Sequence, residues 1–273
     1  MNCVEVISKI QVVDDCHAER SEASQLGRSE SAARAVRLRF LALLGMTSGF
    51  LRPVLGTANF STLERQGMIE LYTWGTSNGR KAAIMLEELG VPYHVHPIDI
   101  SKDAQFTPEF TRINPNQKIP AIVDTDGPDS KPITIFESGA LLMYLGEKYA
   151  KFFPQEPRKR MEVIQWLMFQ MSAVGPIFGQ VHHFKRAAKE QVPYALKRYG
   201  DECRRIYGVL NGRLAEHPFL AADEYSIADI ATWPWVLRHE WQEVNLADFP
   251  NVQRWFQTTA ARPAVQRGIK IPA

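Results

Sequence analysis

The sequence is short of cysteine. Its 273 residues include three cysteines, Cys3, Cys16 and Cys203, which form neither a CxxC pair nor a zinc-ligand spacing. A small secreted protein stabilised by disulfides would normally carry more of them. The scarcity of cysteine therefore indicates a reducing compartment, and we expect the protein to be cytoplasmic.

The sequence also lacks a net charge of either sign and a long apolar run. It has 32 basic and 30 acidic residues, a formal net charge of +2, so no overall field attracts a polyanion such as nucleic acid. The longest apolar stretch, residues 40–51, is interrupted by Gly45 and Gly49 and falls short of the roughly 18 residues that a membrane span requires. We expect small molecules or proteins as partners, and neither nucleic acid nor a membrane.

Residues 1–67 differ from the rest of the chain in composition and in hydrophobic patterning. They are rich in Ser, Ala and Arg and show no sustained helical or strand period. Arg34, Arg37 and Arg39 precede a short apolar run, as in a targeting peptide that would direct the protein to the periplasm or a membrane. The segment also resembles translations of repeated intergenic DNA at the front of over-extended bacterial genes. We expect a non-native or disordered extension, with the working chain beginning near Met68.

Residues 68–150 alternate between β-rich runs and helical pieces. The patterns predict strands at residues 69–72, 93–98, 121–124 and 133–136, and helices at residues 80–90, 108–113 and 138–149. A proline, Pro120, stands directly before the third strand. This order of elements predicts an α/β thioredoxin-like domain.

The rest of the chain predicts an all-α domain. After a linker at residues 151–157, apolar stripes of helical period recur within residues 158–273, at 158–171, 194–215, 227–238 and 250–261. Ser226 and Asp229 are spaced as a capping box, with Tyr225 and Ile230 as its hydrophobic staple. Asp229 is therefore interpreted as a structural residue.

Two motifs of the first domain resemble the glutathione site of the glutathione transferase superfamily. NPNQKIPAIVD is followed by FESGALLMYLGEKY, with the order and context that the superfamily shows. The resemblance implies a cis bond before Pro120, with the Ile119 main chain binding the cysteinyl part of glutathione like a sheet edge. It implies that Glu137 and Ser138 receive the γ-glutamyl group at a helix start. Taken singly, each motif also fits a loop proline or an ordinary helix cap.

The loop YTWGTSNGRK most closely resembles the Nu class, bacterial proteins described as glutathione-dependent disulfide-bond reductases. Its activating Thr and Asn fall on Thr76 and Asn78. Free N–H groups and the positive dipole end at a helix start would stabilise a glutathione thiolate there. The alternative is that Ser77 or Asn78 only caps the helix and Thr76 is a turn residue, with Ser77 the rival partner of the thiol.

The same resemblance places Gln105, Lys118 and Arg198 among the residues that bind glutathione. Arg198 also fits an ordinary solvated position on a charged helix. Histidines are not expected to bind a metal: His182 and His183 are adjacent, with no carboxylate or cysteine to complete a site. His94 and His96 share a strand face and are interpreted as surface residues.

Together these residues predict an enzyme that uses glutathione as co-substrate, with no metal. The first domain contains no cysteine, so both sulfurs of any thiol-disulfide exchange must come from glutathione or the substrate. The resemblance implies attack of a bound thiolate on a disulfide, a peroxide or another electrophile, in a homodimer. The alternative is a non-enzymatic glutathione- or ligand-binding regulator, since a yeast nitrogen regulator has a related domain pair.

Overall fold

The computed structural model describes residues 67–272, so nearly all of the expected extension lies outside the described residues. The first half of the described chain forms a four-stranded mixed sheet of order β2-β1-β3-β4. The strands are β1 (Ile69–Thr73), β2 (Tyr93–Pro97), β3 (Ala121–Asp124) and β4 (Ile133–Phe136). β1 pairs in parallel with β2 and antiparallel with β3, which pairs antiparallel with β4. All four strands lie where the sequence predicts them.

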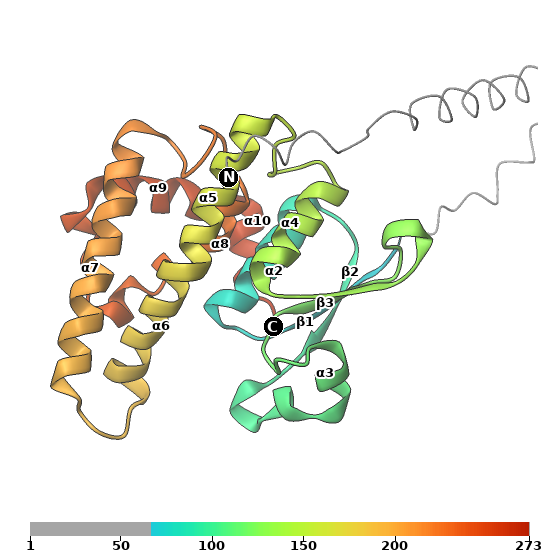
Figure 1. Ribbon diagram of the computed structural model, residues 1–273, viewed down its shortest axis with the longest axis horizontal. Helices are drawn as coiled ribbons and strands as arrows, with labels where there is room; N and C mark the ends of the chain where they lie inside the picture. The colour runs from blue at the N-terminus through green and yellow to red at the C-terminus, as the bar shows by residue number, and fades with distance from the viewer. Residues whose placement is uncertain (1–66, 273) are drawn as a thin grey trace, which may run out of the picture. The chain divides into compact units, whose positions relative to one another are not determined.

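Alternation along β1 directs its two sets of side chains to opposite faces of the sheet. Leu71 is buried in the main apolar cluster, which includes residues of α2 (Ser77–Leu89) and α4 (Ser138–Lys148). On the other face, Tyr72 lies against Phe110 of α3 (Pro108–Ile113), with ring centroids 6.2 Å apart. The sheet is therefore covered by α2 and α4 on one face and by α3 on the other (Figure 1).

The second half is helical, as the sequence predicts. Its α-helices are α5 (Pro157–Phe169), α6 (Gly175–His182), α7 (Pro193–Glu216), α8 (Ile227–Val236), α9 (Pro250–Ala260) and α10 (Pro263–Gly268). The sequence did not predict α6 or α10. A π-helical turn at Gln170–Val174 joins α5 to α6, so the helical path runs through Pro176, which stands near the start of α6.

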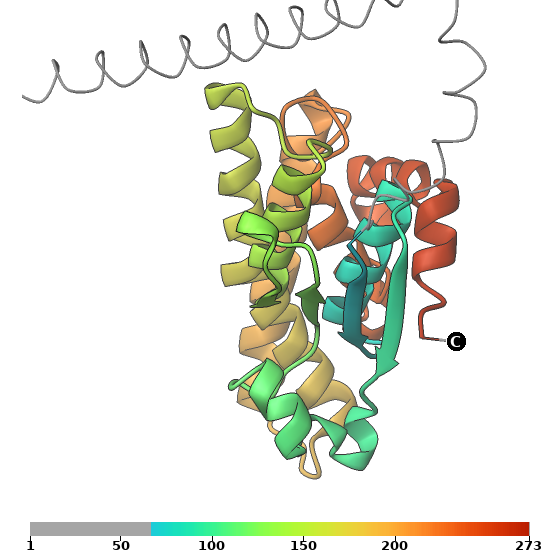
Figure 2. The ribbon, with the colours of Figure 1, turned by 90° about the vertical axis from the view of Figure 1, so that its right-hand side faces the viewer.

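The two halves share one core. α2 and α4 both contact α8, and α10 packs on α2 (Figure 2). Trp233 and Trp255 are almost fully buried, and the predicted capping box at Ser226 and Asp229 is present. Asp229 also accepts hydrogen bonds from Trp255 Nε1 at 2.8 Å and from Leu220 N at 3.0 Å, which confirms its structural role. Among the described helices none is long and apolar enough to cross a membrane.

Candidate functional site

The first part of the candidate site is the start of α2, which begins three residues earlier than the sequence predicts. Thr76 is the N-cap, and its Oγ1 accepts a hydrogen bond from Gly79 N at 3.1 Å. The alternative that Ser77 or Asn78 caps the helix is therefore wrong. Capping uses Thr76 Oγ1 as an acceptor, so its O–H can still donate to an anion in front of the helix.

Asn78 is oriented by the helical half of the chain. Trp235 Nε1, on α8, donates to Asn78 Oδ1 at 3.1 Å. Because the amide oxygen faces the indole, the amide NH₂ is directed elsewhere as a pair of donors. Asn78 and Thr76 are partly exposed, whereas Ser77 is only 5% exposed. The structure therefore presents the hydrogen-bond donors of Thr76 and Asn78 more readily than the hydroxyl of Ser77.

The same loop lies in a positively charged environment. Arg238 Nη2 donates to the Gly75 carbonyl oxygen at 2.8 Å. Burial, together with the nearby charges of Arg80 and Arg186, lowers the pKa of Arg238 to about 10, so its guanidinium stays charged at neutral pH. Cations beside a helix N-terminus favour the thiolate over the thiol.

Gly79 allows β1 and α2 to approach closely at this loop. A Cβ on Gly79 would lie 2.0 Å from the Trp74 carbonyl oxygen and 2.6 Å from Thr73 Oγ1. The first contact is to backbone, so a side chain cannot be accommodated by a rotamer change. Glycine is required for the main chain to turn sharply from strand to helix.

The second part of the site is the loop before β3. The Ile119–Pro120 peptide bond is cis, as predicted. Asn114, which is 2% exposed, supports this loop by donating from Nδ2 to the Lys118 carbonyl oxygen at 2.5 Å. Neither main-chain polar group of Ile119 is among the hydrogen bonds that residues 67–272 make outside regular elements. The Lys118 side chain is exposed.

The third part is the start of α4. Glu137 is its N-cap residue and has φ 67° and ψ 113°, a conformation that is strained for any residue other than glycine. The Glu137 side chain is exposed and makes no capping hydrogen bond, whereas Ser138 is 5% exposed. The strained turn leaves the carboxylate of Glu137 facing solvent at the helix start.

A buried lysine lies behind this turn. Lys81 is 1% exposed, and its Nζ donates to Gln170 Oε1 at 2.6 Å and to Ser138 Oγ at 3.2 Å. Burial lowers the pKa of Lys81 to about 7, and the charge of Glu137 partly offsets this effect. The ammonium group thus connects α2, the start of α4 and the π-helical turn, and it places a titratable positive charge under Ser138.

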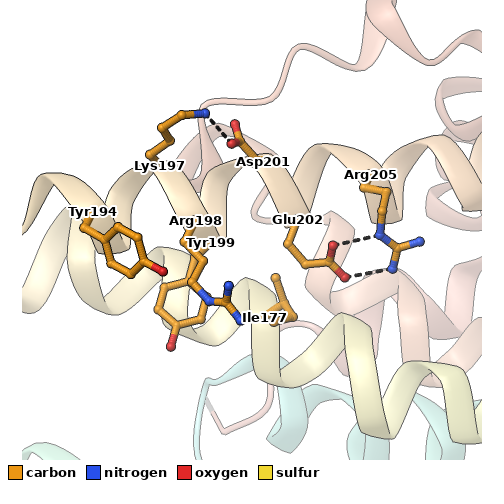
Figure 3. Close-up of a pocket in the computed structure, with 8 residues that line it drawn as sticks. All are labelled: Ile177, Tyr194, Lys197, Arg198, Tyr199, Asp201, Glu202 and Arg205. Atoms are coloured by element: carbon orange, nitrogen blue, oxygen red, sulfur yellow. Dashed lines mark hydrogen bonds and ion pairs between the residues drawn. The ribbon is translucent and has the colours of Figure 1, made fainter.

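Gln105 and Arg198 lie outside this hydrogen-bonded arrangement. Gln105 is on the short 3₁₀ turn Ala104–Phe106, where its Oε1 is enclosed without a hydrogen-bond partner among the described residues. Arg198, on α7, points toward α6 (Figure 3). The pocket that it lines is formed by α6 and α7 only: Ile177, Tyr194, Lys197, Arg198, Tyr199, Asp201, Glu202 and Arg205. No other predicted site residue lines this pocket.

The described chain has no thiol suited to exchange. Its cysteine, Cys203 on α7, is 1% exposed, and burial raises the pKa of its thiol to about 12. A protonated, enclosed thiol is a poor nucleophile. Residues 67–272 therefore supply no reactive sulfur of their own to the α2 start.

Four polar residues of the site were missed by the sequence interpretation: Lys81, Gln170, Trp235 and Arg238. Each acts through a partner far along the chain; Lys81 and Gln170 are 89 residues apart, and Trp235 and Asn78 are 157 apart. One signal was available for Lys81, because Ile84 and Met85, three and four residues later on the same helix face, are apolar. No local signal marks the other three.

Comparison with known proteins gives a consistent result. Residues 77–148 match the glutathione S-transferase N-terminal domain and residues 169–263 match the C-terminal domain. The disulfide-bond oxidoreductase YfcG of Escherichia coli is 46% identical over 203 residues, covering 74% of this chain and 94% of that protein.

Two solved structures extend the comparison. A glutathione transferase from Burkholderia graminis, with two glutathione molecules bound per subunit, is 46% identical with a TM-score of 0.72, over 75% of this chain and 88% of that one. The nitrogen regulation fragment of the yeast prion protein Ure2p is 33% identical with a TM-score of 0.69, over 74% and 96%. With both domains matched in order, the chain belongs to the glutathione S-transferase family.

Proposed function

We propose that this protein is a glutathione-dependent disulfide-bond oxidoreductase that stabilises a bound glutathione thiolate at the start of α2. The observation that carries the proposal is the pair of donors there, the Thr76 O–H and the Asn78 NH₂ oriented by Trp235. They act beside Arg238 and a free helix N-terminus, in a chain whose described thiol is buried. The similarity to YfcG supports the same activity.

The arrangement of the other predicted residues suggests how glutathione is held. Main-chain groups of Ile119 would bind the cysteinyl segment, as a sheet edge binds a peptide. Ser138 and the first N–H groups of α4 would bind the γ-glutamyl carboxylate, and the Glu137 carboxylate its ammonium. Gln105, Lys118 and Arg198 would contact the remainder, with Lys118 neutralising the glycyl carboxylate.

The reaction is two successive exchanges. The bound glutathione thiolate attacks one sulfur of a substrate disulfide, forming a mixed disulfide and releasing the other sulfur as a thiolate that takes a proton from water. A second glutathione thiolate attacks the glutathione sulfur of that mixed disulfide. The products are glutathione disulfide and the second substrate thiol, so two glutathione molecules are oxidised for each disulfide reduced. A peroxide or an electrophile would meet the same thiolate.

We also propose a cytoplasmic homodimer. Met161 and Met168 on α5 are 56% and 44% exposed and lie seven residues apart, on one face of the helix. Exposed apolar side chains in such an arrangement are typical of subunit interfaces. Sedimentation analysis of the wild type and of Met161→Lys/Met168→Lys tests this: the wild type should sediment as a dimer and the double variant as a monomer. A cytoplasmic location follows from the need for reduced glutathione.

The test compares glutathione-dependent reduction of a small dialkyl disulfide with conjugation to a chlorinated nitrobenzene. Asn78→Ala removes a donor to a charged group, worth about 1.5–3 kcal/mol, so the pKa of the bound glutathione thiol should rise by about one to two units. The ultraviolet absorption of the thiolate, followed against pH, measures this shift. Asn245→Ala, an exposed asparagine far from the α2 start in sequence, is the matched control.

Strong disulfide reduction that falls with Asn78→Ala, together with a raised thiol pKa, supports the proposal. An unchanged thiol pKa would overturn the role of Asn78. Tight glutathione binding with neither reaction would favour the alternative, a ligand-binding regulator, for which the likeness to the Ure2p fragment is the supporting observation.

A further inference from the structure

Three side chains of the types that bind metal ions meet on two neighbouring strands of the sheet, β1 and the edge strand β2, apart from the residues assigned to glutathione. Glu70 lies on β1, and His94 and His96 lie on β2, with Glu70 directly opposite His94 in the parallel register. Because side chains alternate along a strand, His94 and His96 point to the same face. The sequence interpretation treated the two histidines as surface residues and did not bring Glu70 to them.

The ligand atoms of these residues converge on one oxygen. Glu70 Oε2 lies 2.6 Å from His96 Nε2 and 3.1 Å from His94 Nδ1, and the ligand atoms of all three residues are within 4.8 Å of one another. In a tetrahedral zinc site with bonds of about 2.0–2.1 Å, ligand atoms stand about 3.3 Å apart. Small changes in side-chain torsion are therefore enough to place the three atoms around one ion.

Two features suit the cluster to an ion rather than to a simple surface ion pair. Tyr72 stacks on His96 with ring centroids 4.4 Å apart and an interplanar angle of 9°, which restrains the ring that a metal would need fixed. The exposed fractions of the side chains of His94, His96 and Glu70 are 65%, 34% and 26%, so the site has a solvent-facing entry at His94. The restrained ring of His96 and the open side at His94 together fit a three-ligand site completed by water.

We propose that Glu70, His94 and His96 bind one divalent transition-metal ion of the Zn²⁺ type, with water at the remaining position. Two imidazoles and one carboxylate suit borderline ions such as Zn²⁺, Ni²⁺ and Cu²⁺, and they are a poor set for Mg²⁺ or Ca²⁺, which prefer oxygen ligands. The ion would link β1 to the edge strand β2. The proposal does not depend on the glutathione chemistry.

The test is a Zn²⁺ titration of the full chain in competition with a chromophoric chelator, without glutathione, which itself binds zinc. The full chain carries Cys3→Ser and Cys16→Ser, so that those thiols do not contribute. We expect one Zn²⁺ per chain. His94→Gln, His96→Gln and Glu70→Gln should each weaken zinc binding by roughly 100-fold, because loss of a direct ligand should cost at least as much as loss of a residue that only hydrogen-bonds to a ligand. His217→Gln is the matched control, because His217 also pairs with a single carboxylate, Asp223.

Two further readouts separate metal binding from loss of structure. Thermal unfolding without metal should be nearly the same for all variants, and added Zn²⁺ should raise the midpoint for the wild type and His217→Gln only. Co²⁺ in place of Zn²⁺ should give the d–d absorption of a four-coordinate site. The proposal is overturned if none of the three single substitutions weakens zinc binding, or if the parent chain binds zinc no more tightly than a variant that carries His94→Gln, His96→Gln and Glu70→Gln together.

Discussion

The starts of α2 and α4 are built from the same elements but suit different chemical groups. Each lies where a strand ends and a helix begins, and each offers free N–H groups to an anion. At α2 the additional groups are neutral donors, Thr76 and Asn78, with arginines at the periphery. At α4 the additional groups are charged, with Glu137 in front and Lys81 buried behind.

This difference shows what a helix N-terminus leaves undecided. The helix itself provides only a general preference for negative charge. Neutral donors that point at one position suit a thiolate. At α4, the carboxylate of Glu137 and the ammonium of Lys81 lie on either side of the Ser138 hydroxyl, which suits a group that carries both charges, such as an α-amino acid. Under the proposed function, the side chains around each helix start would determine which part of glutathione binds there.

The largest expected effect is the loss of stability when a glycine at each of the two helix starts is replaced by alanine. Gly79→Ala should reduce the free energy of unfolding by about 3 kcal/mol or more, because the new Cβ meets backbone at 2.0 Å. Gly139→Ala at the α4 start should cost about 1 kcal/mol or less, because its nearest contact is the flexible side chain of Met171 at 3.1 Å. Urea unfolding of both variants measures the contrast. If Gly79→Ala lowers the free energy of unfolding as little as Gly139→Ala does, the α2 turn is not under steric constraint.

Lys81→Met tests the charge at α4. We expect glutathione affinity to fall roughly 30-fold, about 2 kcal/mol, since the γ-glutamyl carboxylate loses a nearby cation and Ser138 loses a donor. The thiol pKa of the glutathione that still binds should hardly change, because the proposed function places the thiol at the α2 start. Calorimetric titration gives the affinity, with the exposed Lys131→Met as control. A shifted thiol pKa with unchanged affinity would reverse the assignment of the two helix starts.

The same lysine makes stability depend on pH. The folded pKa of Lys81 is about 7, below the ordinary lysine value of 10.5, so between these values the unfolded chain binds a proton that the folded chain does not. Stability then increases as pH rises. From pH 7 to 9 the free energy of unfolding should rise by roughly 2 kcal/mol from this group. Denaturant unfolding at both pH values should show the increase in the wild type and little of it in Lys81→Met.

The smallest effect concerns the orientation of Asn78. Trp235→Phe keeps an aromatic ring against His182 but removes the Nε1 donor, so kcat for disulfide reduction should fall about fivefold, near 1 kcal/mol, with KM for glutathione little changed. Trp233→Phe removes a comparable donor, from the bond to the Phe256 carbonyl, inside the core. It should lower stability and leave kcat unchanged. If kcat falls equally in both variants, the loss in Trp235→Phe reflects reduced stability of the core and not the orientation of Asn78.

Local patterns were sufficient to predict most of the fold. The four strands and the capping box at Ser226 and Asp229 depend on neighbouring residues. The cis bond before Pro120 was implied by the resemblance to the glutathione transferase superfamily. The start of α2 was placed too late because Thr76, Ser77 and Asn78 are all good capping residues. Only the observed bond from Gly79 N to Thr76 Oγ1 distinguishes them.

The parts of the site that sequence could not predict depend on packing between distant segments. A lysine in the run RKAAIMLEELG would ordinarily extend its ammonium group to solvent, even from a helix face that it shares with apolar residues. It is buried because a π-helical turn of the second half brings Gln170 over it, and nothing in the sequence near Lys81 signals that turn. The convergence of Glu70 on His94 and His96 likewise requires the strand register.

The bonds from Trp235 to Asn78 and from Arg238 to Gly75 join the helical half to the loop at the start of α2. Under the proposed function, the helical half would therefore take part in stabilising the glutathione thiolate. A chimaera that joins this α/β half to a foreign helical half without those two side chains should fold and bind glutathione, yet leave its thiol inert. Sequence changes in the helical half are therefore limited by its hydrogen bonds to the loop before α2, which belongs to the other half of the chain.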